Sequence, residues 1–241
     1  MRLAVISDVH GNLDALDAVL ADIAAAAVDM TLSLGDNIGY GAEPEAVLER
    51  LRAAGIPSVC GNHELAAIDP TVRQWFNPLA RQSIEFTRDR LNDETMAYLR
   101  TLPKFIHLGA CWFVHGFPPD SPTVYLFQAD DSEVRDALTA TGCRVCFVGH
   151  THDLELVTTD AASVTREALT SCTLQPDGGK RYLASIGSVG QPRDGNHDAK
   201  YVIYHTDTGT LTVRYVPYDR EAAARKIIAA GLPKNHANRL L

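Results

Sequence analysis

The stretch Leu3-Ala-Val-Ile-Ser-Asp-Val-His-Gly-Asn12 begins as an apolar strand and ends in side chains that bind metal ions. Asp8 and His10 follow the strand directly, and Gly11 allows the chain to turn sharply after them. Asn12 stands where it can cap a helix, because apolar residues recur at helical spacing immediately beyond it. A strand, a polar loop and a helix in this order are typical of an α/β sheet.

The same alternation continues to residue 60. We expect strands at Leu3–Ile6, Thr31–Leu34 and Pro57–Cys60, and a second helix over Glu43–Ala54 with proline in its first turn. This β-α-β-α-β order predicts neighbouring parallel strands.

The later part of the chain changes its pattern twice. Residues 65–100 have a helical pattern, and we interpret roughly 65–104 as a helical insertion or cap. Short apolar strands are expected at 111–114 and 145–148, and turn-rich segments such as Pro176-Asp-Gly-Gly separate the strands that follow. These later strands are Leu154–Val157, Ser163–Ala168, Tyr182–Ile186, Tyr201–His205 and Leu211–Val216. They predict a second, mixed or antiparallel sheet, and we expect a helix over Asp219–Ala230 followed by a short end segment from Gly231.

Composition limits the class of protein. The 241 residues are 46% hydrophobic, so we expect one domain over 1–241 in which both sheets share a core. No apolar run approaches the roughly 20 residues that cross a bilayer, and no secretory signal is recognisable, so we expect a cytoplasmic protein without a membrane anchor. Five scattered cysteines suit a reducing compartment, and Cys143 and Cys146 are interpreted as strand residues. The net charge of -8 argues against an extended nucleic-acid surface but is compatible with a small phosphorylated substrate.

Four further clusters of metal-binding side chains follow apolar runs as Asp8 and His10 do. They are Gly35-Asp36, Gly61-Asn62-His63-Glu64, His115-Gly116 and Gly149-His150-Thr-His152. In open α/β sheets the carboxyl ends of the strands meet at one edge, so residues distant in sequence can share a cleft. Together the clusters suit two divalent metal ions held side by side.

The ligand types indicate the metals and the reaction. Imidazole and carboxylate without thiolate suit Mn, Fe, Zn or Ni, and Mn is our first expectation. Asp36 can bridge two ions and Asn62 can supply a neutral oxygen, which leaves the pair of ions with the net positive charge that a phosphate substrate needs. We expect a hydroxide on the metals to attack phosphorus, which leaves His63 as the general acid for the departing oxygen.

Over residues 1 to about 218, this motif set resembles that of the calcineurin-like metallophosphoesterase superfamily, which includes a diadenosine-tetraphosphatase-like branch. The later segment Gly187-Ser-Val-Gly-Gln-Pro-Arg-Asp-Gly195 is similar to one in small bacterial and archaeal phosphodiesterases of this superfamily, where it usually follows Asn-Pro in place of Ser185-Ile186. The resemblance implies an α/β fold of four layers (αββα), in which helices flank two mixed β-sheets around a dinuclear centre. It implies that one metal is held by Asp8, His10, Asp36 and His152, and the other by Asp36, Asn62, His115 and His150. His63 resembles the catalytic histidine of the family.

One departure narrows the activity. Serine/threonine protein phosphatases of the superfamily carry Gly-Asp-x-x-Asp-Arg-Gly, where this chain has Gly35-Asp-Asn-Ile-Gly-Tyr-Gly41. Protein phosphatase activity is therefore less favoured than hydrolysis of small phosphodiesters or phosphoanhydrides, including diadenosine polyphosphates, and Glu64 is a candidate for orienting His63. A non-catalytic scaffold of the same fold is the alternative from another class, although such scaffolds tend to lose ligands that are all present here.

The substrate is less well defined than the reaction. Asn12, Tyr40 and Arg193 are candidates for binding it; Arg193 suits a phosphate oxygen, or alternatively a surface ion pair. The loop 117–131 carries three aromatic residues that either stack on a nucleobase or pack beneath the loop, namely Phe117, Tyr125 and Phe127. The other histidines are interpreted as ordinary strand, loop or tail residues, namely His107, His197, His205 and His236. A small, nucleotide-like substrate is expected, and the oligomeric state is left open.

Overall fold

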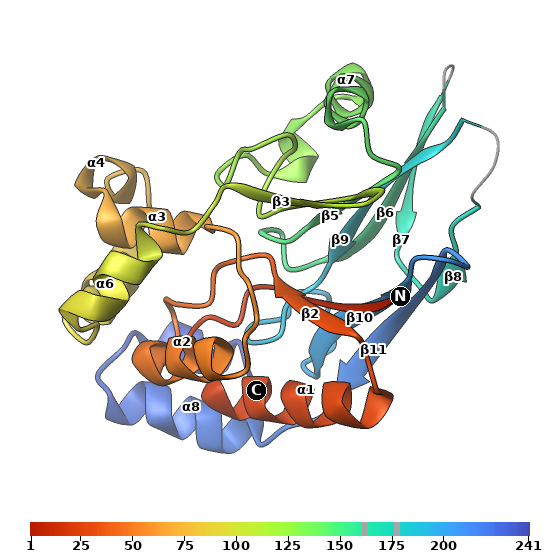
Figure 1. Ribbon diagram of the computed structural model, residues 1–241. Coiled ribbons are helices and arrows are strands. Elements are labelled where there is room, and N and C mark those ends of the chain that lie inside the picture. Colours follow the sequence, from red (N-terminus) through yellow and green to blue (C-terminus); the bar gives the residue numbers. More distant parts are fainter. Residues whose placement is uncertain (161–162, 176–178) are drawn as a thin grey trace.

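The computed structural model describes residues 1–160, 163–175 and 179–241. Two β-sheets stack face to face and helices cover both outer surfaces, so the chain forms four layers (Figure 1). This arrangement confirms the expected fold. Most of the turn expected at Pro176-Asp-Gly-Gly, residues 176–178, lies outside the described residues.

Both sheets are mixed. The first has the order β2-β1-β10-β11-β8, in which only β1 and β2 run parallel. Its strands are β1 (Arg2–Ile6), β2 (Met30–Ser33), β8 (Cys172–Thr173), β10 (Ala199–His205) and β11 (Thr210–Val216). The second has the order β3-β4-β5-β9-β6-β7, with parallel pairs at β4-β5 and β5-β9. Its strands are β3 (Phe105–Leu108), β4 (Cys111–Val114), β5 (Val145–Val148), β6 (Leu154–Thr159), β7 (Val164–Ala168) and β9 (Arg181–Ile186).

Strand β1 shows how the layers are built. Its side chains alternate between two apolar clusters because successive residues of a strand face opposite sides. Leu3 and Val5 pack between the two sheets, whereas Ala4 and Ile6 pack against helix α1 (Leu13–Ala26). The sheet is therefore buried on both faces, and its polar loops are left at the strand ends.

The helices lie in three groups. Helices α1, α2 (Pro44–Ala53), α8 (Arg220–Ala229) and α9 (Lys234–Asn238) lie on the side of the first sheet, and α7 (Asp131–Thr141) covers the second (Figure 1). The third group lies to one side of the sheets and packs around its own cluster: α3 (Asn62–Ile68), α4 (Pro70–Arg73), α5 (Pro78–Arg88) and α6 (Asp93–Leu99). These four helices occupy most of the stretch 65–104 that the sequence predicts to be helical. A short 3-10 helix, η1 (Leu126–Gln128), lies in the loop before α7.

Two expectations were wrong. The strand expected at Pro57–Cys60 is reduced to one isolated bridge between Ser33 and Ser58. The amides that would extend the ladder donate elsewhere, that of Gly35 to Ser33 Oγ and that of Gly61 to Glu64. The later strands do not form a sheet of their own: β6, β7 and β9 join the second sheet, and β8, β10 and β11 join the first. Strands β3 and β8 and helix α9 were not expected.

The expected terminal helix is present as α8, where the Asp219 carboxylate accepts a hydrogen bond from the Ala222 amide at 2.8 Å. In the described part of the chain, no helix has the length and apolar character to span a bilayer. All five cysteines carry free thiols, and Cys146 lies buried within β5, as its apolar neighbours predict.

Candidate metal centre

The loops that carry the expected ligands have an unusual backbone. Five ligand candidates adopt left-handed conformations with φ between 50° and 69°: Asp8, His10, Asp36, His150 and His152. Outside glycine this conformation is uncommon and costs about 1–2 kcal/mol per residue. Such strain is concentrated at functional sites, where surrounding contacts maintain it.

Backbone contacts hold these loops against one another. The Asp8 amide donates to Gly35 at 3.0 Å and the His10 amide donates to Asp36 at 2.9 Å. At Gly35, a Cβ atom would lie 2.5 Å from the backbone nitrogen of Gly61, so only glycine permits this approach. The ends of β1 and β2 and the start of α3 are thereby packed into one unit.

Asp8, His10 and His152 form the first ligand group. Asp8 Oδ1 lies 3.3 Å from His152 Nε2 and 3.7 Å from His10 Nε2. The two Nε2 atoms are 3.1 Å apart. Each ring directs its Nδ1 to a backbone carbonyl, Ile38 for His10 and Gln191 for His152.

Asp36, His115 and His150 form the second group, and Asn62 joins it. His115 Nε2 lies 2.9 Å from Asn62 Oδ1, 3.2 Å from His150 Nδ1 and 3.3 Å from Asp36 Oδ2. The remaining ring nitrogens again meet backbone carbonyls, that of Leu34 for His115 and that of Thr123 for His150.

Asp36 lies between the two groups. Its Oδ2 atom is 3.3 Å from His115 Nε2 and 3.8 Å from His10 Nε2, and its Oδ1 accepts a hydrogen bond from the His63 amide at 2.8 Å. One carboxylate oxygen therefore faces ligands of both groups, which is the position of a bridging ligand.

The donor set fits divalent metal ions. When an imidazole donates one N–H to a carbonyl, its other nitrogen carries a lone pair, and here such nitrogens face one another at 3.1 and 3.2 Å. Facing lone pairs repel unless a proton or a cation lies between them. In addition, Asp8 Oδ1 is buried and makes no hydrogen bond among the described residues. These atoms provide nitrogen and oxygen ligands without sulfur, the set that suits Mn, Fe, Zn or Ni.

The charge states of the ligands agree with this fit. Burial lowers the pKa of His10 well below its ordinary value and that of His150 to about 3, so both rings are neutral and free to bind metal. Burial opposes ionisation of Asp36, but the neighbouring charge of His115 holds the Asp36 pKa well below its usual range. Burial also opposes protonation of His115, yet the attraction of Asp36 raises its pKa to about 9. A metal ion would take the place of that proton.

The Glu64 side chain hydrogen-bonds to backbone amides and not to the His63 ring, which we expected it to orient. Its carboxylate accepts hydrogen bonds from the amides of Asp36, Asn37 and Gly61 at 2.7–3.0 Å, and burial raises its pKa to about 7. It therefore fixes the backbone of the bridging loop and makes no hydrogen bond to the ring of His63.

His63 lies beside both groups in an aromatic pocket. Its ring centroid is 4.5 Å from that of Tyr40, 4.7 Å from that of His10 and 5.1 Å from that of Phe76. Nε2 lies 3.9 Å from Asp36 Oδ2, whereas Nδ1 is buried without a hydrogen bond among the described residues. Burial lowers the pKa of His63 to about 4, so the free ring is neutral.

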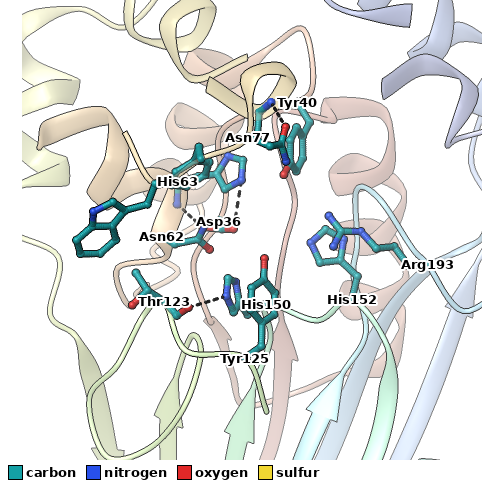
Figure 2. A pocket seen from close by; sticks show the side chains of 13 residues that line it. Asp36, Tyr40, Asn62, His63, Asn77, Thr123, Tyr125, His150, His152 and Arg193 are labelled. Carbon is teal, nitrogen blue, oxygen red and sulfur yellow. Dashed lines mark hydrogen bonds and ion pairs between the residues drawn. The ribbon is translucent and has the colours of Figure 1, made fainter. Parts of the chain in front are cut away.

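A cavity opens beside His63 and onto part of both ligand groups (Figure 2). It is lined by Asp36, Tyr40, Asn62, His63, Trp75, Phe76, Asn77, Ala80, Thr123, Tyr125, His150, His152 and Arg193. The structure thus brings Tyr40 and Arg193 to the cavity but not Asn12. The Asn12 side chain accepts from the Ala15 amide and donates to Gly190 and Tyr218, so its polar atoms hold helix α1 in place.

The three aromatic residues of the loop 117–131 have different roles. Tyr125 stacks on the His150 ring at 3.7 Å and lines the cavity. Phe127 stacks on the outer side of Tyr125, and Phe117 packs against the apolar cluster under α7.

Sequence reasoning missed several cavity residues. Trp75 and Phe76 come from the loop between α4 and α5, and Asn77 and Ala80 come from the start of α5. The signal was present, because Trp75-Phe76 is an isolated aromatic pair in a strongly polar helical stretch. Trp75 is 72% exposed and lines the cavity.

The fold and the site define a class. An α/β sandwich that gathers aspartate, asparagine and histidine ligands at strand ends is a metallophosphoesterase scaffold, and comparison with known proteins identifies the family. The calcineurin-like phosphoesterase superfamily domain matches residues 1–209. The chain therefore belongs to the calcineurin-like phosphoesterase superfamily, a family of phosphoester hydrolases.

Individual relatives agree with this assignment. A metallophosphoesterase from Sphaerobacter thermophilus is 35% identical and superposes with a TM-score of 0.84, over 100% of this chain and 98% of that one. An uncharacterized protein of Methanocaldococcus jannaschii is 33% identical over 99% of this chain and 96% of its own length. A hypothetical protein of Pyrococcus horikoshii shares the fold, with a TM-score of 0.79 at 17% identity over 99% of this chain and 97% of that one.

Proposed function

We propose that the chain is a dinuclear metal-dependent phosphoesterase that hydrolyses phosphodiester or phosphoanhydride bonds of small, nucleotide-like substrates. The observation that carries this proposal is the position of Asp36, which lies between two ligand groups at the cavity that also holds His63. One group would consist of Asp8, His10, Asp36 and His152, and the other of Asp36, Asn62, His115 and His150.

Divalent ions bound there would supply Lewis acidity toward phosphoryl oxygens and would make a water molecule acidic near neutral pH. The chain itself supplies orientation, since each ligand imidazole is fixed by a hydrogen bond to a backbone carbonyl. It also supplies a proton donor. His63 is neutral in the free site, but the negative charge of a bound phosphate favours its protonated form, from which Nε2 can protonate the departing oxygen.

The cavity wall supports a substrate with an aromatic part. Trp75 and Tyr125 present ring surfaces to the cavity, and Arg193 adds a positive charge. Base stacking on aromatic side chains contributes about 1–3 kcal/mol per base in other proteins. A nucleotide combines an aromatic base with a phosphate, which matches both features.

We extend the proposal to the setting of the enzyme. The free thiols of all five cysteines favour a reducing, cytoplasmic compartment, and the net charge of -8 disfavours an extended nucleic-acid surface. We treat residues 1–241 as one domain in which the helices of 65–104 form a cap beside the cavity, and we favour Mn as the metal.

The test is hydrolysis of bis-p-nitrophenyl phosphate by protein dialysed against chelator and reloaded with Mn²⁺. Turnover is expected in the reloaded protein and not in the stripped protein. Asp36→Asn should abolish it, whereas His107→Ala, which alters an exposed histidine on β3, should not. If the reloaded protein binds no metal and Asp36→Asn matches the parent in all respects, the chain is a scaffold and not an enzyme.

A further inference from the structure

Two arginines from distant parts of the chain converge on one side-chain oxygen. Arg193 lies in the loop between β9 and β10, and Arg239 follows helix α9 near the end of the chain. Arg193 Nη2 lies 3.5 Å from Gln191 Oε1, and Arg239 Nη1 lies 3.2 Å from the same atom. Gln191 is itself buried, so this oxygen is a fixed point between two guanidinium groups.

Within residues 1–160, 163–175 and 179–241, neither guanidinium has a carboxylate partner within ion-pair distance. The neighbouring carboxylate of Asp194 is paired with the fully buried Lys200 at 2.9 Å. Both arginines are exposed, so water screens part of their mutual repulsion, but one neutral oxygen does not balance two positive charges. An anion between the two groups would relieve this repulsion and accept hydrogen bonds from both.

The pair lies next to the metal centre. The backbone carbonyl of Gln191 accepts from His152 Nδ1 at 2.6 Å, so one residue contacts a metal-ligand candidate through its main chain and both arginines through its side chain. Figure 2 shows Arg193 on the same side of the cavity as His152, away from His63 and Asn62.

Tyr40 links the C-terminal arginine to the same cavity. Tyr40 lines the cavity together with Arg193. The Tyr40 ring also contacts His236 of helix α9, with ring centroids 4.7 Å apart. Helix α9 therefore packs against a residue of the cavity wall, and Arg239, which follows this helix, is connected to the cavity residue Arg193 through Gln191.

We propose that Arg193 and Arg239 form a binding site for a second anionic group of the substrate, a phosphoryl group that is not the one attacked. Substrates that carry two or more phosphoryl groups, such as nucleoside diphosphates or dinucleoside polyphosphates, would then be preferred over simple phosphodiesters. The proposal rests on the proposed function for the identity of the first site, and it assigns a substrate-binding role to the C-terminal segment.

The test compares two non-hydrolysable ligands by calorimetric titration of Mn-loaded protein: α,β-methylene-ADP and the phosphonate analogue of AMP. The parent should bind the ADP analogue about tenfold more tightly, since one charge-assisted phosphate contact corresponds to about one order of magnitude in affinity. Arg239→Gln should remove this preference and leave affinity for the AMP analogue within about twofold. Arg225 is an exposed arginine of α8 whose carboxylate contact lies within its own helix. Arg225→Gln should therefore keep the preference for the ADP analogue.

A second variant distinguishes a ligand-binding role of Arg239 from a purely structural role. Gln191→Glu gives both arginines an internal carboxylate, so it should weaken the ADP analogue without lowering the melting temperature. If Arg239 only anchors helix α9, Arg239→Gln will lower the melting temperature and weaken both analogues equally, which overturns the proposal. Absence of bis-p-nitrophenyl phosphate hydrolysis with the preference intact would instead contradict the proposed function and leave the two-arginine site standing.

Discussion

His63 is the residue on which the proposed chemistry depends most. Its ring lies within 4.8 Å of ligand atoms of His10 and Asp36, close enough to bind a metal ion together with them. A role as metal ligand and a role as proton donor predict different outcomes when His63 is replaced. We expect His63→Ala to lower kcat by about 10²–10⁴-fold, the usual contribution of general acid–base catalysis, while both metal equivalents are retained. Metal content measured by elemental analysis checks this, with His107→Ala as the control. Loss of one metal equivalent would show that His63 is a ligand.

Gly39 allows a sharper test of the same ring. A Cβ atom at this position would lie 2.0 Å from His63 Nδ1, and the backbone φ is +84°. Gly39→Ala should therefore displace the ring and reduce turnover by more than about tenfold with metal retained. Gly55→Ala is the matched control, because Gly55 has a φ of +65° with open space around it. Both variants should lose about 1 kcal/mol of stability from backbone strain, but equal turnover in the two would contradict the assigned geometry.

At the residue scale, the sequence predicted what depends on local pattern. The strand-end clusters could be recognised because metal ligands and a glycine follow each apolar run, and the structure brings all of these ligand candidates together. Asn12 caps α1 as its spacing predicts and does not line the cavity, and Glu64 binds backbone amides and not the His63 ring. A polar side chain can bind either a ligand or the adjacent backbone, and spacing does not distinguish them. The convergence of Arg193 and Arg239 was invisible because it depends on how α9 packs.

At the scale of elements, the pairing of strands was harder to predict than their existence. Strands β6, β7, β9, β10 and β11 were expected close to their observed positions, but the sequence does not say that β10 inserts beside β1 while β9 pairs with β5. Pairing is decided by contacts between residues far apart in the chain. Strand β3, Phe105–Leu108, was missed although three of its four residues are apolar, because so short a run at a sheet edge, interrupted by His107, has no distinct strand pattern.

Helix α9 gives a prediction about acid stability. Burial lowers the pKa of His236 to about 4, against an ordinary value of about 6.5. Between these values the unfolded chain binds a proton that the folded chain does not, so stability falls as pH decreases through this window. His236→Phe removes this contribution. On acidification from pH 7 to pH 4.5, the parent should lose about 1–3 kcal/mol more stability than the variant, as measured by urea unfolding. Parallel pH profiles for the two proteins would contradict this origin.

At the scale of the whole molecule, the candidate metal centre connects the layers. Its candidate ligands come from the ends of β1, β2, β4 and β5 and from the start of α3, so they join both sheets to the helical group of residues 62–99. Without metal, these loops bring carboxylates, lone pairs and left-handed backbone together in a buried space. A bound ion would therefore stabilise contacts between the layers and not only one loop.

This connection predicts that metal removal destabilises the entire fold. A ligand present at 100 times its dissociation constant contributes about 2.7 kcal/mol, which for a chain of this size corresponds to a rise in melting temperature of about 5–10 °C. Calorimetry of protein reloaded with Mn²⁺ and of protein kept in chelator should show this difference in a single transition. Asp8→Asn should remove most of the shift because it weakens the first ligand group, whereas Asp136→Asn, which makes the same change of charge on the exposed face of α7, should preserve it. Equal melting temperatures with and without metal in the parent would mean that the layers are stable independently of the site.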